Sequence, residues 1–185
     1  MVDEAISVAE YLEGEKISEV RHELIAGCVH AMSGGSLKHN RISGNIFGAL
    51  DDYLHGGSFR PFINDVKVMV RTLSDENFYY PDVVVTCDPA DTHEYYLESP
   101  TSIFEVLSPS TEEWDRNQKL FAYRSLASLE EYILVSQERR EVTVVRRSSG
   151  WRAETLSGED FELSLSCGGA VLKSGRIYRG VDFAS

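Results

Sequence analysis

Hydrophobic residues recur along this chain with two different periods. Apolar residues at helical spacing predict a short helix over residues 5–16, with Ile6, Val8, Ala9 and Leu12 on its apolar side, and a longer helix that Ser36 caps and that ends near Leu54. Alternation of apolar and polar residues predicts a strand within residues 59–71. A more uniformly apolar run predicts a buried strand over residues 78–87. Both patterns together predict an α/β protein.

A strand, a helix and a second strand follow in the second half of the chain. Residues 102–107 form the first predicted strand, a helix runs from about 111 to 126 with Ser110 or Thr111 as its cap, and residues 131–135 form the second strand. This order is typical of a crossover between two parallel strands. Tight turns predict a hairpin from residues 21–25 and 28–32, and a more solvent-facing hairpin from residues 140–147 and 151–156. The remaining segments are interpreted as a turn at 73–77, a loop at 88–101 and irregular β structure with a tail at 157–185.

The length bounds the number of domains. A chain of 185 residues with 42% hydrophobic residues is long enough for one well-buried domain and short for two. We expect a single domain with a mixed central β-sheet flanked by helices. Its core covers about residues 20–147, with the N-terminal helix 5–16 and a C-terminal β extension over 148–185 as additions.

Charge and cysteine content narrow the class of protein. The net charge of −12 neither supports nor excludes nucleic-acid binding, because basic residues could still gather on one face. No run of 18 apolar residues and no basic signal segment is present, and the three cysteines are far apart, so we expect a cytoplasmic protein without a membrane partner. A zinc site from His22, Cys28 and His30 lacks the paired cysteines of a zinc knuckle, and ordinary strand residues are the better interpretation.

Two acidic residues stand inside the apolar runs. Asp82 follows Pro81 and precedes three valines, and Glu105 lies between Phe104 and Val106. Burying an ionised carboxylate costs several kcal/mol, unless a cation or dense hydrogen bonding compensates it. If the two strands are neighbours, both carboxylates can reach one divalent cation, and such hard oxygen ligands suit Mg²⁺ or Mn²⁺.

A lysine on the following helix completes the candidate site. Lys119 and Asp115 are four residues apart and share a helix face, which Tyr123 extends by one more turn. A lysine beside a metal-bound water can orient it or help to deprotonate it, and can offset charge on a phosphate. These groups are the parts that hydrolysis of a phosphodiester needs.

At these residues the chain resembles the restriction-endonuclease-like superfamily, named for its PD-(D/E)xK signature. Pro81-Asp82 and Glu105 match the signature, but Leu107 stands where its lysine would be, and Lys119 is placed to supply that group from the helix, as in several branches of the superfamily. The chain is most similar to a family of such endonucleases that is abundant in cyanobacteria and often described only as a domain of unknown function. The similarity covers about residues 8–160, and its motifs are Tyr11-Leu12, residues 23–27, His39, Pro81-Asp82-Val83, the run from Glu105 to Thr111, Asp115 with Lys119, and Glu131-Tyr132.

The resemblance implies a metal-dependent nuclease core with a restriction-endonuclease-like fold. Our leading hypothesis is an endonuclease that hydrolyses phosphodiester bonds of DNA. Asp82, Glu105 and the backbone carbonyl of Val106 would hold Mg²⁺ (or Mn²⁺), Lys119 would position the attacking water, and Glu23 and His39 would support the site.

Each of these residues also has a simpler interpretation. Asp82 could end a strand after Pro81, Glu105 could be a structural acid, and Lys119 alone would be a solvated helix residue. Glu23 could equally be a polar hairpin residue, and His39 a surface histidine of a first helical turn. Asp65 could support the site from behind, whereas Ser108 and Ser110 lack the strained glycine-flanked turn of a nucleophile, and capping accounts for Ser110.

The acidic surroundings keep a second hypothesis open, a catalytically inactive nuclease fold that serves as a binding or oligomerisation module. Residues 82–115 contain no lysine or arginine, so DNA would be repelled there without metal. Basic residues would have to come from elsewhere, such as Lys38, Arg41, Arg60, Lys67 or Arg71. We also expect a homodimer, in which the hairpin after residue 140 supplies the contact.

Overall fold

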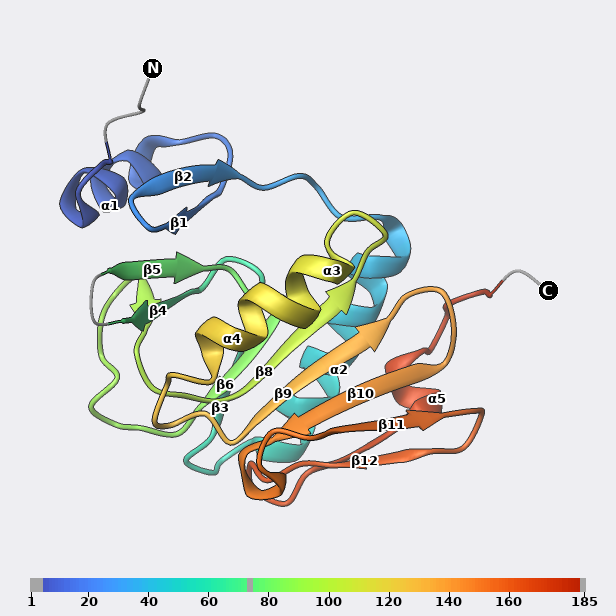
Figure 1. Cartoon of the computed structure of the whole chain (residues 1–185). Helices are drawn as coiled ribbons and strands as arrows, with labels where there is room; N and C mark the ends of the chain where they lie inside the picture. The colour runs from blue at the N-terminus through green and yellow to red at the C-terminus, as the bar shows by residue number, and fades with distance from the viewer. Residues whose placement is uncertain (1–4, 73–74, 184–185) are drawn as a thin grey trace.

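Six strands form the central sheet of the protein in a computed structural model, which describes residues 5–72 and 75–183 (Figure 1). The strands are β3 (Arg60–Ile63), β6 (Val83–Thr86), β8 (Pro100–Leu107), β9 (Glu131–Ser136), β10 (Glu141–Arg146) and β11 (Ala153–Ser157). Their order across the sheet is β11-β10-β9-β8-β6-β3, and only β8 and β9 pair in parallel. This mixed sheet confirms the predicted fold class, and the parallel pair confirms the predicted crossover.

A second sheet of five strands stands beside the first. Its order is β2-β1-β5-β4-β7, from β1 (His22–Ile25), β2 (Cys28–Ala31), β4 (Lys67–Arg71), β5 (Glu76–Tyr79) and β7 (Tyr96–Leu97). The predicted hairpin of β1 and β2 is present, and its turn at Ala26 and Gly27 has φ angles of 49° and 77°. Of the turn predicted at 73–77, residues 73 and 74 lie outside the described residues.

Two of the crossings between the sheets fall within predicted strands, and they correct both predictions. Residues 59–71 form β3 in the central sheet and β4 in the second sheet, and residues 78–87 contain the end of β5 and all of β6. Asn64 takes a left-handed φ of 58° at the first crossing. Pro81 lies at the second, where a residue without an N–H would interrupt a strand ladder. Because β5 and β6 are mostly buried in their different sheets, hydrophobicity alone does not mark the break between them.

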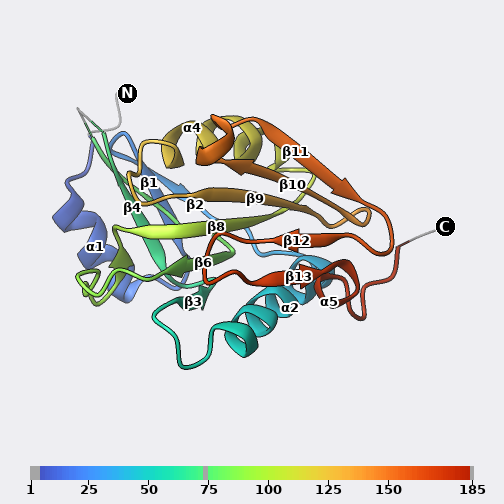
Figure 2. The same cartoon turned by 90° about the horizontal axis from the view of Figure 1, so that it is seen from below.

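Helices cover opposite faces of the central sheet (Figures 1 and 2). On one face lies α2 (Leu37–Leu54), whose first turn is capped by the Ser36 hydroxyl, which accepts the N–H of His39 at 3.0 Å. On the other lies a helix built from α3 (Glu112–Trp114), a π-helical turn (Asp115–Lys119) and α4 (Leu120–Tyr123). Phe104 and Val106 of β8 pack in the core beneath α2, and Ile103 and Leu107 pack on the other side. Alternation therefore directs Glu105 toward the helix that carries Lys119.

The C-terminal segment is part of the core beneath α2. β12 (Glu162–Ser164) pairs with β13 (Val171–Lys173), and α5 (Ser174–Ile177) follows. Leu163, Leu172 and Tyr178 are buried in one cluster with Val142 and Val144 of β10. The expectation of a more solvent-facing β10 was therefore wrong, since this segment covers its valines, and the irregular β structure expected over 157–185 contains the short strands β12 and β13. Exposure is confined to β11, whose residues are all exposed or half-buried.

The N-terminal helix α1 (Val8–Ile17) packs on the second sheet through Tyr11. This side chain is 2% exposed and contacts the Phe78 ring at 5.3 Å between centroids, whereas the predicted core residues Ile6, Val8 and Leu12 are only half-buried. Ala9, also predicted on the apolar side, is exposed. In the described part of the chain, no helix combines the length and the apolar character needed to cross a membrane.

Candidate active site

Asp82 lies at the crossing between β5 and β6, not within a strand. Its carboxylate is held by two groups at one oxygen: the backbone N–H of Val106 donates to Oδ2 at 2.7 Å, and Nε2 of His39 lies 3.1 Å from the same atom. The side chain is 15% exposed. The crossing thus places Asp82 near the carboxyl end of β8, where solvent can reach its carboxylate.

Glu105 lies at the buried centre of the site. Its Oε1 accepts a hydrogen bond from Nζ of Lys119 at 3.1 Å and one from the hydroxyl of Tyr123 at 3.3 Å. The residue is 4% exposed. The helix face predicted from the spacing of Asp115, Lys119 and Tyr123 therefore does lie against Glu105.

Lys119 is surrounded by three carboxylates. Besides Glu105, Oε1 of Glu23 lies 3.2 Å and Oδ1 of Asp115 lies 3.5 Å from its ammonium nitrogen. All four side chains are at least nine-tenths buried. Tyr132 of β9 donates its hydroxyl hydrogen to the backbone carbonyl of Asp115 at 3.0 Å, which ties the π-helical turn to the sheet. In the sequence, Tyr132 is marked only as an aromatic residue of a buried strand, so its hydrogen bond to Asp115 was not predicted.

Glu23 reaches the cluster from β1 in the second sheet. The same Oε1 that contacts Lys119 also accepts the backbone N–H of Tyr80 at 3.2 Å. This acid does not line the cavity described below. Its direct contacts are with the lysine and with the crossing segment, so it belongs to the site through Lys119.

For each group of this cluster, burial and the nearby opposite charge shift the pKa in opposite directions. Burial raises the pKa of Glu105 well above its usual value, since the positive charge of Lys119 offsets only part of the effect and neighbouring acids add to it. Burial likewise raises the pKa of Asp115. Burial alone would lower the pKa of Lys119, but its three carboxylates outweigh burial and raise it well above the usual value. These shifts favour the charged form of the lysine, in which it donates hydrogen bonds.

His39 faces Asp82 from the first turn of α2. Burial opposes its protonation, but the hydrogen bond and charge of Asp82 outweigh burial, and the pKa of His39 lies above its usual value. The ring packs closely on the preceding loop: a Cβ on Gly35 would come within 2.9 Å of its Nδ1. The Ser36 hydroxyl also donates to Oε1 of Gln137, just beyond β9, at 2.7 Å. Gln137 was not predicted, because nothing in its sequence context marks it.

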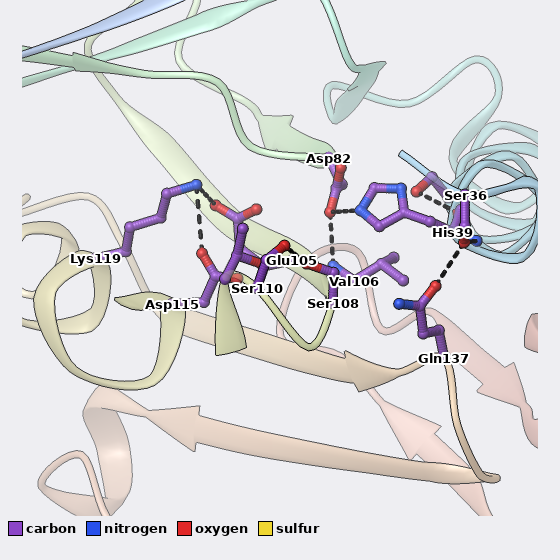
Figure 3. Close-up of polar contacts among 12 residues, drawn as sticks. Ser36, His39, Asp82, Glu105, Val106, Ser108, Ser110, Asp115, Lys119 and Gln137 are labelled. Carbon is purple, nitrogen blue, oxygen red and sulfur yellow. Dashed lines mark hydrogen bonds and ion pairs between the residues drawn. The ribbon is translucent and has the colours of Figure 1, made fainter. Parts of the chain in front are cut away.

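These side chains surround one cavity of about 370 Å³. Figure 3 shows Lys119 and Asp115 beside Glu105, and the Asp82 carboxylate between the Val106 N–H and the His39 ring. The cavity is lined by four of the five predicted catalytic residues, Asp82, Glu105, Lys119 and His39, and by Val106. The lining also includes Arg21, Asn40, Asn64, Ser108, Ser110, Thr111, Asp115 and Gln137.

Two of the three carboxylates that line the cavity, those of Asp82 and Glu105, have the chemistry of Mg²⁺ ligands. In the described chain, the hydrogen bonds and ion pairs of Asp82 involve Oδ2, and those of Glu105 involve Oε1. Oδ1 of Asp82 and Oε2 of Glu105 therefore receive no protein donor. No set of three or more His, Cys, Asp or Glu side chains within residues 5–72 and 75–183 is grouped as metal ligands. Two carboxylates fit Mg²⁺, which is commonly held by one or two carboxylates and otherwise by water and substrate.

Three other candidates lie away from the site or lack its chemistry. Asp65 is 81% exposed and pairs with Arg21 at 2.6 Å, so it does not support the metal ligands. The hydroxyls of Ser108 and Ser110 lie 3.0 Å apart, and the capping expected of Ser110 was wrong, because the helix after Thr111 has no side-chain cap. The three residues of the imagined zinc site are not grouped with other metal ligands in the part of the chain described.

Comparison with known proteins places this architecture among nuclease folds. The chain is similar to a solved structure of a putative nuclease belonging to DUF820 from Anabaena variabilis, with a TM-score of 0.74 and 17% identity over 93% of this chain and 97% of that one. It is also 33% identical to the uncharacterised protein slr1290 of Synechocystis sp. over 181 residues, which cover 96% of this chain and 94% of that protein. A second Synechocystis protein, the uncharacterised sll1609, is 30% identical over 166 residues, or 87% of this chain and 93% of that one.

A family model extends the similarity over nearly the whole chain. Residues 8–171 match the model of the Uma2 family, whose description is "putative restriction endonuclease". The match includes the residues that line the cavity, from Arg21 to Gln137, and it confirms the resemblance stated from the sequence motifs. The chain therefore belongs to the Uma2 family of putative restriction endonucleases.

Proposed function

We propose that this protein is a Mg²⁺-dependent endonuclease that hydrolyses phosphodiester bonds of DNA, with Mn²⁺ as a substitute metal. The observation that carries the proposal is the position of Lys119, whose ammonium is bound to Glu105 at 3.1 Å and lines the same cavity as Asp82. Membership in a family of putative restriction endonucleases and the likeness to a nuclease fold support the general class.

The ligands of the cation would be Asp82, Glu105 and the backbone carbonyl of Val106. When bound, Mg²⁺ would supply Lewis-acid activation of the phosphate. The Val106 N–H fixes the Asp82 carboxylate by its hydrogen bond to Oδ2, which leaves Oδ1 for the cation. Around the cluster stand the carboxylates of Glu23, Asp82, Glu105 and Asp115, and the excess of negative charge favours binding of a divalent cation.

Lys119 would orient the attacking water and neutralise charge on the phosphate by donating hydrogen bonds. Glu23 holds the ammonium from behind the cavity and fixes its position against Glu105. His39 orients Asp82 and presents its ring to the cavity, where it can contact a phosphate oxygen. Positioning of this kind, together with charge stabilisation, supplies most of the catalysis of phosphoryl transfer.

The first test combines metal binding and cleavage. We expect wild-type protein to bind Mn²⁺ in calorimetry and to nick supercoiled plasmid in Mg²⁺. Glu105→Gln should lose both, and Lys119→Met should lose nicking, by at least 100-fold, a typical loss for one charge-stabilising donor. Asp65→Asn is the matched control, because this acid is exposed and lies outside the cavity. Equal nicking by wild type and Lys119→Met would mean a contaminant or another catalytic residue.

The inactive binding module remains the second candidate, and the charge of the chain favours it. Residues 82–115 contribute acids without any lysine or arginine, and the whole chain carries a net charge of −12. Metal binding without any nicking, on plasmid or single-stranded DNA, would support this candidate. The expected homodimer is a further proposal that rests on the exposed edge strand β11. Light scattering at the mass of one chain would contradict it.

A further inference from the structure

Nearly every basic side chain of this acidic protein is already engaged. All 18 lysines and arginines lie in the described residues. Most form an ion pair with an acid, and others donate to backbone carbonyls or lie over aromatic rings. Arg41 and Arg179 have no such contact, and Lys38 has only the Phe183 ring, 5.8 Å from its ammonium nitrogen. Eight of the 18 thus lack an acidic partner among the described residues, and three of these eight, Lys38, Arg41 and Arg179, line the same cavity.

These three residues gather around one cavity of about 670 Å³. Lys38 and Arg41 are three residues apart on α2 and therefore share a side of the helix. Arg179 comes from the C-terminal segment, which Asn45 holds against α2 by donating to the carbonyls of Ile177 at 2.9 Å and Arg179 at 2.8 Å. The only acid in the lining is Asp182, which is exposed. The fold therefore fixes a patch of net positive charge.

The basic cavity adjoins the candidate active site. Asn40 lines both cavities, and it follows His39, which contacts Asp82. A strand of DNA that places one phosphate beside Asp82 and Glu105 must continue past one rim of that cavity. Because the segment 82–115 carries no basic residue, the side of α2 offers the phosphates a favourable path.

We propose that Lys38, Arg41 and Arg179 form the surface that binds the DNA backbone next to the cleavage site. This inference rests on the proposed endonuclease function and adds the contact surface for its substrate. The contact would recognise phosphate charge and not base sequence, because it consists of three cationic side chains, two on α2 and one on the C-terminal segment. Such a surface would allow a protein of net charge −12 to bind a polyanion.

The test measures DNA binding apart from cleavage, by fluorescence anisotropy of a labelled 20-bp duplex in EDTA over 50–200 mM salt. At 100 mM salt we expect Arg41→Ala/Arg179→Ala to bind about 60-fold more weakly than wild type, and the slope of log affinity against log salt to fall by about two, since each phosphate contact contributes about 0.9. Arg41→Lys/Arg179→Lys should restore binding, because charge is retained. Lys16→Ala/Lys173→Ala removes the same charge from exposed, ion-paired positions, and this control should bind within about twofold of wild type.

The possible failures are distinguishable. If wild type nicks plasmid and binds the duplex, but Arg41→Ala/Arg179→Ala binds it as well as the control does, the basic surface is wrong and the endonuclease function stands. If wild type binds the duplex without nicking, the surface stands and the endonuclease function fails. Absence of duplex binding by wild type, or binding of an RNA duplex alone, would overturn the surface. Matching melting temperatures show that all variants are folded.

Discussion

One ammonium group faces three carboxylates at the centre of this molecule, and the imbalance governs what single substitutions do. Glu23, Glu105 and Asp115 come within 3.2, 3.1 and 3.5 Å of Lys119. A buried ion pair adds little to stability compared with apolar residues of the same volume, but the loss of one partner leaves an uncompensated charge. The site is therefore most sensitive to removal of its single cation.

We expect Lys119→Met to destabilise the metal-free protein by about 3–5 kcal/mol at pH 7.5, because buried carboxylates lose their counter-charge. Urea denaturation in EDTA measures the change. The double variant Glu23→Gln/Lys119→Met should be more stable than Lys119→Met, since one of the unpaired acids has been neutralised. Equal stability of the two variants would contradict this, because it would show that the Glu23 carboxylate costs no stability when the lysine is absent.

The three thiols should differ in reactivity. Cys28 is exposed, Cys87 is half-buried and Cys167 is buried. Burial raises the pKa of the Cys167 thiol from 9.0 to about 11. Because its folded-state pKa lies above the unfolded value, the stabilising contribution of this thiol is present below pH 9 and is lost as the pH rises toward 11. At pH 8, Ellman's reagent should modify Cys28 rapidly and Cys167 only after unfolding; rapid modification of all three in the native protein would contradict this.

At the scale of elements, the start of α2 holds the histidine side of the cavity. Ser36 accepts the backbone N–H of His39 at 3.0 Å and donates to Gln137 at 2.7 Å, so one hydroxyl caps the helix and links it to the end of β9. The π-helical turn positions Lys119 in a similar way, because the Tyr132 hydroxyl of β9 donates a hydrogen bond to the backbone of this turn. Both ends of the site are thus fixed by contacts that begin in the central sheet.

Replacement of this cap should loosen the site locally. We expect Ser36→Ala to lower the free energy of unfolding by about 1 kcal/mol, the usual cost of a lost helix cap. Ser36→Thr retains a hydroxyl and should lose less. Thermal denaturation of the three proteins compares them. No difference between Ser36→Ala and wild type would mean that water replaces the hydroxyl at no cost.

The sequence predicted the helices and pairings more reliably than the breaks between strands. The caps and periodicity of residues 37–54 and the motif around Glu105 depend on local chemistry, which a single sequence displays. The separation of residues 78–87 into two strands depends on which sheet each half joins, and Tyr79 and Val83 are buried in both cases. Asp82 was consequently identified as a site residue from its motif, but its position was assigned to a strand instead of a crossing.

At the scale of the whole molecule, the C-terminal segment shares one core with α2. Leu163, Leu172, Ile177 and Tyr178 are at most 2% exposed, and they belong to the same cluster as Ile42 and Ile46. A side chain of this kind contributes about 1.5–3 kcal/mol when fully buried. The segment after residue 157 is therefore required for the core, although the hydrophobic pattern presents it as an extension.

We expect truncation after Ser157 to prevent folding, since the apolar side of α2 would lose its cover. Far-ultraviolet circular dichroism and gel filtration of the truncated chain check this. Truncation after Val181 is the matched control, because it retains the buried residues and removes only the last four positions of the chain. A cooperative thermal transition in the shorter protein would show that residues up to 157 fold independently.

The crossing at Asp82 determines when, during folding, the groups of the proposed site come together. Glu23 comes from the second sheet, Glu105 from the central sheet, Lys119 from the helix above it and His39 from the helix below it, while Asp82 lies on the link between the sheets. No fragment of the chain contains these groups at working distance before both sheets have docked. The proposed site is therefore complete only in the folded chain, and for the proposed endonuclease a partly unfolded chain would be inactive.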